Sequence, residues 1–171
     1  MIQNMLRGVP VLTGTDFLQD KTRFESLARN IIYTGRIDEY FGFCFGQLEF
    51  RSLLFEEELL PTPNFQGNAI INYTHRDVPY TRIVEHKHFE YGQQPVTVIT
   101  REYPISPQNT DDVYYPINDN RNNLLYEKYL RMSQAFPHLH FTGRLGAYRY
   151  FDMHQVVRNS LHLFEQLNSR N

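Results

Sequence analysis

The stretch from Asn68 to Phe89 limits the fold more than any other part of the chain. It alternates apolar and polar positions as a pair of β-strands does, yet polar and charged side chains interrupt it. A strand pair that only built a core would carry Val, Ile and Thr in these places. Arginine and asparagine on a rigid sheet can hold a polar ligand, and arginine suits phosphate, so we interpret the stretch as a ligand-facing sheet. Its polar residues are Asn72, Tyr73, Arg82, Glu85, His86 and His88.

This stretch belongs to a block of consecutive predicted strands. Alternating apolar positions predict each strand, and turns rich in proline or glycine separate them. The predicted strands cover residues 48–55, 69–73, 81–89 and 96–102. Neighbouring strands joined by short turns pair antiparallel, so we expect an antiparallel sheet and an α+β fold.

Both flanks of the block alternate short strands with helices, as an open α/β layer does, but lack a first βαβ unit. Helices are predicted to end near residue 6 and to cover 21–28, 38–45, 120–136 and 152–168; strands are predicted over 9–12, 30–34 and 140–142. The last helix has a capping-box spacing at Asp152 and Gln155 and a stripe of Met153, Val157, Leu161 and Phe164. Because its layer is incomplete, we expect this helix and strand 30–34 to expose apolar side chains.

Composition excludes several classes of protein. A chain of 171 residues with 41% hydrophobic and 21% charged residues is globular and can bury a sizeable core. A net charge of -2 argues against nucleic acid or an acidic membrane as a partner. The single cysteine, Cys44, excludes an internal disulfide, and its apolar surroundings predict a buried, inert thiol. We find neither a membrane-spanning run nor a signal peptide, and we expect a cytoplasmic location.

The sequence bears on three kinds of chemical site: a metal site, a catalytic nucleophile and a phosphate-binding loop. The pairs His86/His88 and His138/His140 could each place two metal ligands on one face of a strand, but neither has a third ligand nearby in sequence, so we predict no metal. The chain also lacks a nucleophile motif and a G-x-G-x-x-G phosphate loop.

Two features have an ordinary interpretation beside a functional one. Arg51 and Arg82 lie in mid-strand, either as ligand-binding groups or as surface arginines paired with Glu49 or Glu85. The segment 144–153 leads into the last helix, whose free backbone N–H groups at its start could bind an anion. The segment is also compatible with an ordinary loop in which Asp152 caps the helix.

Seven segments spread over the chain resemble UDP-galactopyranose mutases, and they occur in the same order. They read IIYTGRIDEYFG, LEFRSL, QGNAIINYT, VPYTRIVEHKHF, TVITREYP, YYPIND and GRLGAYRYFDM. The resemblance implies a flavoprotein with a Rossmann-type FAD-binding domain and an antiparallel substrate sheet, of which this chain is similar to the C-terminal half. The resemblance implies that residues 1–47 and 117–171 are pieces of the incomplete FAD-binding domain. It implies that residues 48–116 form the antiparallel-sheet substrate domain. The N-terminal half, the helical domain and the mobile substrate loop are missing.

The resemblance also implies roles for individual residues. Arg82 and Arg51 match catalytic arginines. Asn72, Arg82, Tyr115, Tyr150 and Asp152 match substrate-binding residues, and Phe17, Gly143, Arg144, Asp152 and Met153 match residues near FAD.

The implied reaction interconverts UDP-galactopyranose and UDP-galactofuranose, and the implied substrate is UDP-galactose. Reduced flavin attacks the anomeric carbon through N5, and UDP leaves and later returns. The resemblance implies an isomerase of polysaccharide precursor synthesis. We expect the isolated chain to be inactive. A homo-oligomer stays open as its oligomeric state.

Two other functions stay open at this point. The first is a flavin oxidoreductase of the amine-oxidase type, which would share the last strand and helix but would not need this set of arginines and tyrosines. The second is a non-catalytic sheet module that binds a nucleotide or a partner chain, which the missing phosphate loop favours.

Overall fold

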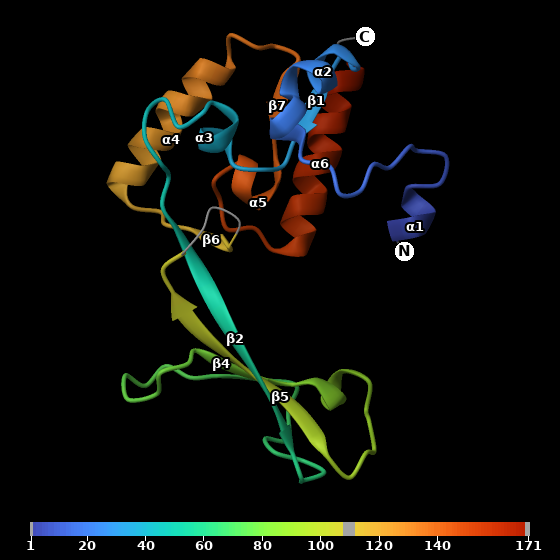
Figure 1. The fold of residues 1–171 in the computed structure, drawn as a ribbon, viewed down its shortest axis with the longest axis vertical. Helices are drawn as coiled ribbons and strands as arrows, with labels where there is room; N and C mark the ends of the chain where they lie inside the picture. The colour runs from blue at the N-terminus through green and yellow to red at the C-terminus, as the bar shows by residue number, and fades with distance from the viewer. Residues whose placement is uncertain (1, 108–111, 170–171) are drawn as a thin grey trace.

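Two lobes joined by a pair of long strands make up the computed structural model, which describes residues 2–107 and 112–169 (Figure 1). The lower lobe contains most of an antiparallel sheet, and the upper lobe contains most of the helices and a short parallel strand pair. Strand β2 (Phe50–Leu60) starts in the upper lobe and runs through the lower one. At about 3.3 Å per residue its length is roughly 35 Å. Strand β5 (Thr97–Ile105) pairs with it from Leu60 back to Ser52, so the two strands together link the lobes.

The sheet has five strands in the order β3-β4-β5-β2-β6, and every neighbouring pair is antiparallel. The antiparallel sheet predicted from the alternation is therefore confirmed. The other four strands are β3 (Ile70–Asn72), β4 (Arg82–Glu85), β5 (Thr97–Ile105) and β6 (Tyr115–Pro116). Strand β2 continues past the predicted end at residue 55 because β5 pairs with it as far as Leu60 and Thr97.

The predicted strand over 81–89 is wrong in its second half. Strand β4 ends at Glu85, and a 3₁₀ helix, η2 (His86–Phe89), follows it. Residue alternation alone does not distinguish these two structures over so short a segment.

The upper lobe has a parallel strand pair, β1 (Ile31–Tyr33) with β7 (Leu139–Phe141). Its helical elements are η1 (Phe17–Asp20), α2 (Lys21–Ser26), α3 (Ile37–Tyr40), α4 (Asn120–Ser133), α5 (Gly143–Gly146) and α6 (Met153–Asn168). Gly146 lies so close to the strand pair that a Cβ there would be 2.9 Å from the carbonyl oxygen of Tyr33. Glycine therefore allows α5 to pack directly against the end of β1.

The two clusters of buried hydrophobic residues lie in the upper lobe, and half of their residues are aromatic. One buried cluster consists of Ile37, Leu48, Phe50, Tyr129 and Tyr148; a second consists of Ile31, Tyr40 and Leu139. A buried ion pair supports the first cluster: Arg36 donates to Asp38 at 2.7 Å, and Asp38 also accepts from the backbone N–H of Leu48 at 2.8 Å. The paired charges satisfy each other, so this polar group is tolerated inside the core.

Two predictions in the first third of the chain are wrong. Residues 9–12 form no strand, and Val9, Val11 and Leu12 are exposed, because no described strand lies beside them to satisfy their backbone groups. Cys44 is exposed rather than buried, since it lies in the turn that follows α3. The helix predicted before Gly8 is present as α1 (Ile2–Met5), which stands apart from both lobes (Figure 1).

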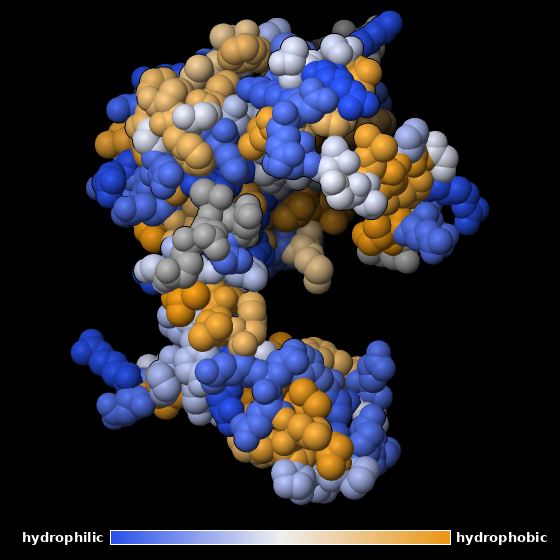
Figure 2. All heavy atoms as spheres, viewed as in Figure 1, coloured by the Kyte–Doolittle hydropathy of each residue, from blue (hydrophilic) through white to orange (hydrophobic). Residues whose placement is uncertain are grey.

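Apolar side chains are exposed where the sequence predicted them. The stripe Met153, Val157, Leu161 and Phe164 on α6 is 58–87% exposed, and Ile32 on β1 is 53% exposed. Figure 2 shows further hydrophobic residues gathered over α1 and on the sheet lobe. Within residues 2–107 and 112–169, none of the helices combines the length and the apolar character that crossing a bilayer demands.

Candidate functional site

The predicted ligand-facing residues of the sheet lie together at its outer strands. Asn72 on β3 pairs in register with Arg82 on β4, which pairs in turn with Glu102 on β5. Residues opposite each other in an antiparallel sheet point to the same face, so the three side chains form a row. The Nε of Arg82 donates to Oδ1 of Asn72 at 3.0 Å, and its NH1 lies 3.5 Å from a carboxylate oxygen of Glu102.

The ion partner of Arg82 therefore differs from the one considered in the sequence. Glu85 is fully buried, and its carboxylate accepts from the backbone N–H groups of Phe65 and Gln66 at 3.0 and 2.8 Å. Burial by itself raises the pKa of Glu85, but these backbone donors outweigh burial and lower it to about 2. Glu85 holds the loop between β2 and β3, and Arg82 keeps 37% of its side chain exposed.

The second predicted arginine, Arg51, lies at the other end of the same sheet face. It pairs in register with Tyr115 on β6, and the even spacing from Arg51 to Phe55 on β2 places it on the face of Arg82. Two strand spacings and four residues along β2 separate the two arginine backbones by about 16 Å. The guanidinium of Arg51 has no hydrogen bond or ion pair within the described part of the chain, and Glu49 pairs instead with Arg121.

Three predicted residues from distant parts of the sequence meet beside Arg51. The guanidinium carbon of Arg144 lies 4.7 Å from the ring centroid of Tyr150 and 5.5 Å from that of Tyr115. The two rings are 5.4 Å apart. Arg144 also donates through Nε and NH2 to the carbonyl of Phe151, at 3.2 and 2.7 Å. These contacts fix the segment that carries Tyr150, and neither tyrosine hydroxyl has a hydrogen-bond partner among residues 2–107 and 112–169.

The beginning of α6 follows this cluster directly. The backbone N–H of Asp152 donates to Oε1 of Gln155 at 2.8 Å, as the capping-box spacing predicted. Met153 is 87% exposed. Gly143 has a φ of +74° and lies beside Thr34, where β1 ends. The predicted cofactor-binding residues Gly143, Arg144 and Met153 thus surround the ends of the parallel strand pair and the start of α6.

Phe17 lies apart from this cluster. Its ring packs 5.6 Å from Tyr33 and 6.2 Å from Tyr40, in the second hydrophobic cluster. The structure therefore places Phe17 at the edge of the core beside β1, and its contact with a cofactor stays a prediction.

The pair His86/His88 does not have the strand geometry that a shared metal would use. His86 and His88 lie on η2, where Nε2 of His86 is 2.6 Å from the hydroxyl of Thr100 and Nε2 of His88 is 3.1 Å from Glu85. In the described ranges, no three side chains of His, Cys, Asp or Glu gather into a metal-binding group.

Two residues that sequence reasoning did not single out belong to the structure of the site. Glu102 is the ion partner of Arg82, and only the register of β4 with β5 identifies it. Tyr148 lies in the segment GRLGAYRYFDM, two residues before Tyr150, and is buried. Its spacing from Tyr150 is the one signal that could have pointed to it.

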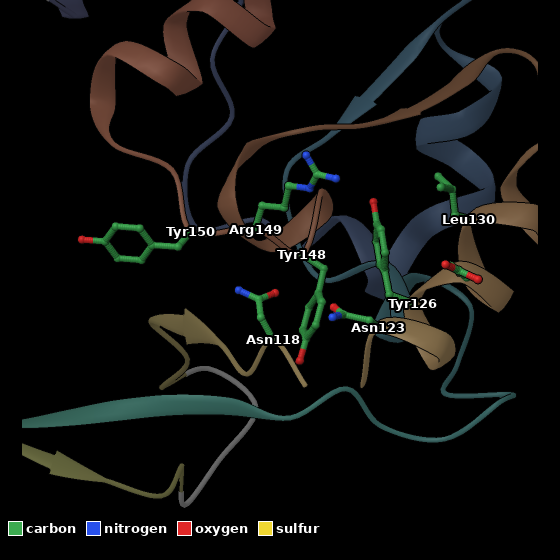
Figure 3. Close-up of a pocket in the computed structure, with 8 residues that line it drawn as sticks. Asn118, Asn123, Tyr126, Leu130, Tyr148, Arg149 and Tyr150 are labelled. Carbon is green, nitrogen blue, oxygen red and sulfur yellow. The ribbon is translucent and has the colours of Figure 1, made fainter. Parts of the chain in front are cut away.

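A hollow of about 600 Å³ borders the segment that carries Tyr148 and Tyr150 (Figure 3). Tyr148 and Tyr150 both line it, but the side chain of Tyr148 extends between Asn118 and Asn123, while that of Tyr150 extends in a different direction. Alternate tyrosines of one short segment therefore face different surroundings, one the interior and one the candidate site.

A sheet face with two arginines, continued by two tyrosines and a third arginine, is typical of a site for an anionic, sugar-like or nucleotide ligand. A family model described as UDP-galactopyranose mutase matches residues 1–150. The chain is 35% identical over 150 residues to UDP-galactopyranose mutase of Mycoplasma pneumoniae, covering 84% of this chain and 37% of the relative. It is 37% identical over 133 residues to a probable UDP-galactopyranose mutase of Klebsiella pneumoniae, covering 77% of this chain and 34% of the relative.

A dTDP-fucopyranose mutase of Escherichia coli is 32% identical over 133 residues, covering 77% of this chain and 35% of the relative. The chain belongs to the UDP-galactopyranose mutase family. It spans about a third of the length of these curated relatives. The family match ends at Tyr150, so Asp152 and Met153 lie outside it.

Proposed function

We propose that this chain supplies the sheet wall and the C-terminal return of an FAD-dependent mutase that interconverts UDP-galactopyranose and UDP-galactofuranose. The observation that carries the proposal is the cluster of Tyr115, Tyr150 and Arg144 beside Arg51, on the sheet face that also carries Arg82. These five residues come from four segments that are far apart in sequence. An ordinary surface would not be expected to gather so many phosphate-compatible donors on one face.

Each donor has a role in the proposed reaction. Arg51 offers a guanidinium that has no ion partner among the described residues, and Arg82 offers its exposed edge, so both can hold phosphate oxygens and the negative charge that develops on departing UDP. The Tyr115 and Tyr150 hydroxyls can donate to the diphosphate. Asn72 orients Arg82 through its side-chain oxygen, and Asp152 contributes an acid next to Tyr150.

The residues at the end of the parallel strand pair and at the start of α6 fit one side of a flavin site. In an open α/β layer, ligands bind beyond the carboxyl ends of parallel strands, and here those ends are followed by Thr34 and by Gly143 with Arg144. We propose that Gly143, Arg144, Asp152 and Met153 contact the flavin and that Phe17 lies nearer the adenine. The strand pair would then be part of a Rossmann-like domain whose phosphate loop lies outside this chain. Reduced FAD, when bound, supplies the nucleophile for the anomeric carbon.

The test uses the full reading frame that contains this chain. Purified protein, reduced with dithionite, is incubated with UDP-galactofuranose, and the products are separated by anion-exchange chromatography. We expect UDP-galactopyranose to form only with reduced protein, and a reduced, flavin-loaded protein without turnover would refute the proposal.

One relative supports a second candidate substrate. Because the Escherichia coli relative is named a dTDP-fucopyranose mutase, a dTDP-linked 6-deoxy sugar is a plausible alternative to UDP-galactose for this chain. The same assay with dTDP-fucopyranose distinguishes them: the true substrate is the one with the larger kcat/KM.

A further inference from the structure

Tyr148 is held in an unusual way for a residue outside the predicted site. Its φ is +46°, a conformation that residues other than glycine, asparagine and aspartate rarely adopt. Its side chain is only 1% exposed, and its ring packs against Phe50 at 5.2 Å and Tyr126 at 5.7 Å. The surrounding core must therefore impose this backbone geometry, since the residue itself does not favour it.

The hydroxyl of Tyr148 joins two other segments. It donates to the carbonyl oxygens of Glu49, at 2.6 Å, and Ile117, at 3.0 Å, in a shared hydrogen bond. The backbone N–H of Ile117 also donates to Glu49 at 3.0 Å, which continues the ladder between β2 and β6 by one step. The phenol therefore closes the end of this ladder. Burial raises the pKa of Tyr148, so the hydroxyl keeps its proton over the working range of pH.

Each residue in this arrangement lies two positions from a residue of the proposed site. Glu49 lies just before β2 and precedes Arg51 by two, Ile117 lies just after β6 and follows Tyr115 by two, and Tyr148 precedes Tyr150 by two. Two residues of extended chain span about 7 Å, so a shift at the phenol would reach all three side chains. The side chain of Tyr148 bonds the residue just before β2 and the residue just after β6, and the segment of Tyr148 also carries Tyr150.

We propose that Tyr148 is a positioning residue that sets the spacing among Arg51, Tyr115 and Tyr150 and thereby the fit of the diphosphate. The proposal rests on the proposed function of these three residues. It does not require Tyr148 to touch the ligand, because Tyr148 and Tyr150 point to different surroundings (Figure 3).

A matched control separates positioning from stability. Tyr129 is another fully buried tyrosine of the same hydrophobic cluster, and its hydroxyl likewise donates to a backbone carbonyl, that of Gly46, at 2.7 Å. Its hydroxyl also accepts from the N–H of Phe45 at 3.0 Å, and neither partner belongs to the β2–β6 ladder. Tyr148→Phe and Tyr129→Phe therefore delete equivalent buried hydroxyls, one inside the proposed support of the site and one outside it.

The experiment measures UDP binding to the full-length enzyme by isothermal titration calorimetry, with melting temperatures of the same samples. We expect Tyr148→Phe to weaken UDP binding between about tenfold and a hundredfold, since small displacements of binding groups have effects of this size. Tyr129→Phe should lower the melting temperature by a similar amount and leave the Kd for UDP within about twofold, as sites without shared partners behave independently. Calorimetry is done in the cold so that a destabilised variant is still folded.

A double-mutant cycle supplies the second measurement. If Tyr148 acts by placing Tyr150, adding Tyr148→Phe to Tyr150→Phe should weaken UDP binding much less than Tyr148→Phe does alone. Equal UDP affinities of Tyr148→Phe and Tyr129→Phe, or fully multiplicative effects in the cycle, would overturn the inference. Failure of the wild-type enzyme to bind UDP at all would instead refute the proposed function.

Discussion

Replacing Arg82 by alanine tests whether the sheet face takes part in the reaction. The guanidinium donates to Asn72 and pairs with Glu102, yet 37% of the side chain stays exposed. A donor aimed at charge that develops in the transition state contributes about 3–4 kcal/mol. We therefore expect Arg82→Ala in the full-length enzyme to lower kcat by about a hundred- to a thousandfold.

The structural contacts of Arg82 predict a much smaller effect on stability. A hydrogen bond near the surface contributes about 1 kcal/mol, and a partly exposed ion pair contributes at most about 1 kcal/mol. The free energy of unfolding should thus fall by about 1–2 kcal/mol. Arg82→Lys should restore little activity, because an ammonium group cannot bond Asn72, Glu102 and a phosphate with one planar fork.

The control is Arg101→Ala, on the opposite face of the same sheet. Arg101 pairs in register with Ile83, next to Arg82, and its guanidinium bonds Glu58 at 2.7 Å. The variant loses a comparable ion pair and should keep near-normal kcat. Turnover is measured with dithionite-reduced enzyme and UDP-galactofuranose, alongside thermal unfolding. If Arg82→Ala turns over within about threefold of Arg101→Ala, Arg82 has no part in the reaction and the assignment of the sheet face is wrong.

Three further predictions follow from other contacts. Arg144→Lys should weaken UDP binding by about tenfold in calorimetry, because lysine cannot make the paired hydrogen bonds to Phe151 or stack on Tyr150. The pKa of Glu85 is lower in the folded state, about 2, than its ordinary 4.5, so its stabilisation is complete above pH 5 and lost as the pH falls from 5 to 2. The shift corresponds to at most about 3 kcal/mol, and urea titrations at several pH values measure the stability that is lost. The 171-residue chain, expressed as such, should bind a hydrophobic dye through the stripe on α6, and Leu161→Glu should reduce the fluorescence.

Each of these has its own decisive result. An unchanged Kd for UDP in Arg144→Lys would remove the stacked arginine from the ligand site. An acid transition that is the same in Glu85→Gln as in the wild type would show that another group governs it. Equal dye fluorescence from Leu161→Glu and from Leu124→Glu, a change at an exposed leucine on α4, would show that the α6 stripe is not the binding surface.

The sequence by itself determined much of the fold and the family. Alternation and turn residues predicted the antiparallel sheet, since both depend on neighbours a few positions apart. The apolar stripe on α6 and the capping contact of Asp152 were likewise readable from local spacing. The resemblance of the motifs to UDP-galactopyranose mutases agrees with the family match over residues 1–150.

Only the tertiary structure decided which residues act on one another. Arg82 pairs with Glu102 rather than Glu85 because the register of β4 with β5 selects the partner, and register is a property of the paired sheet. Residues 9–12 form no strand because a strand requires a neighbour for its backbone groups. Tyr148 is separated by about 30 and 100 positions from the two carbonyls that its hydroxyl joins. Such contacts carry no local pattern, so they become visible only when the folded chain brings the segments together.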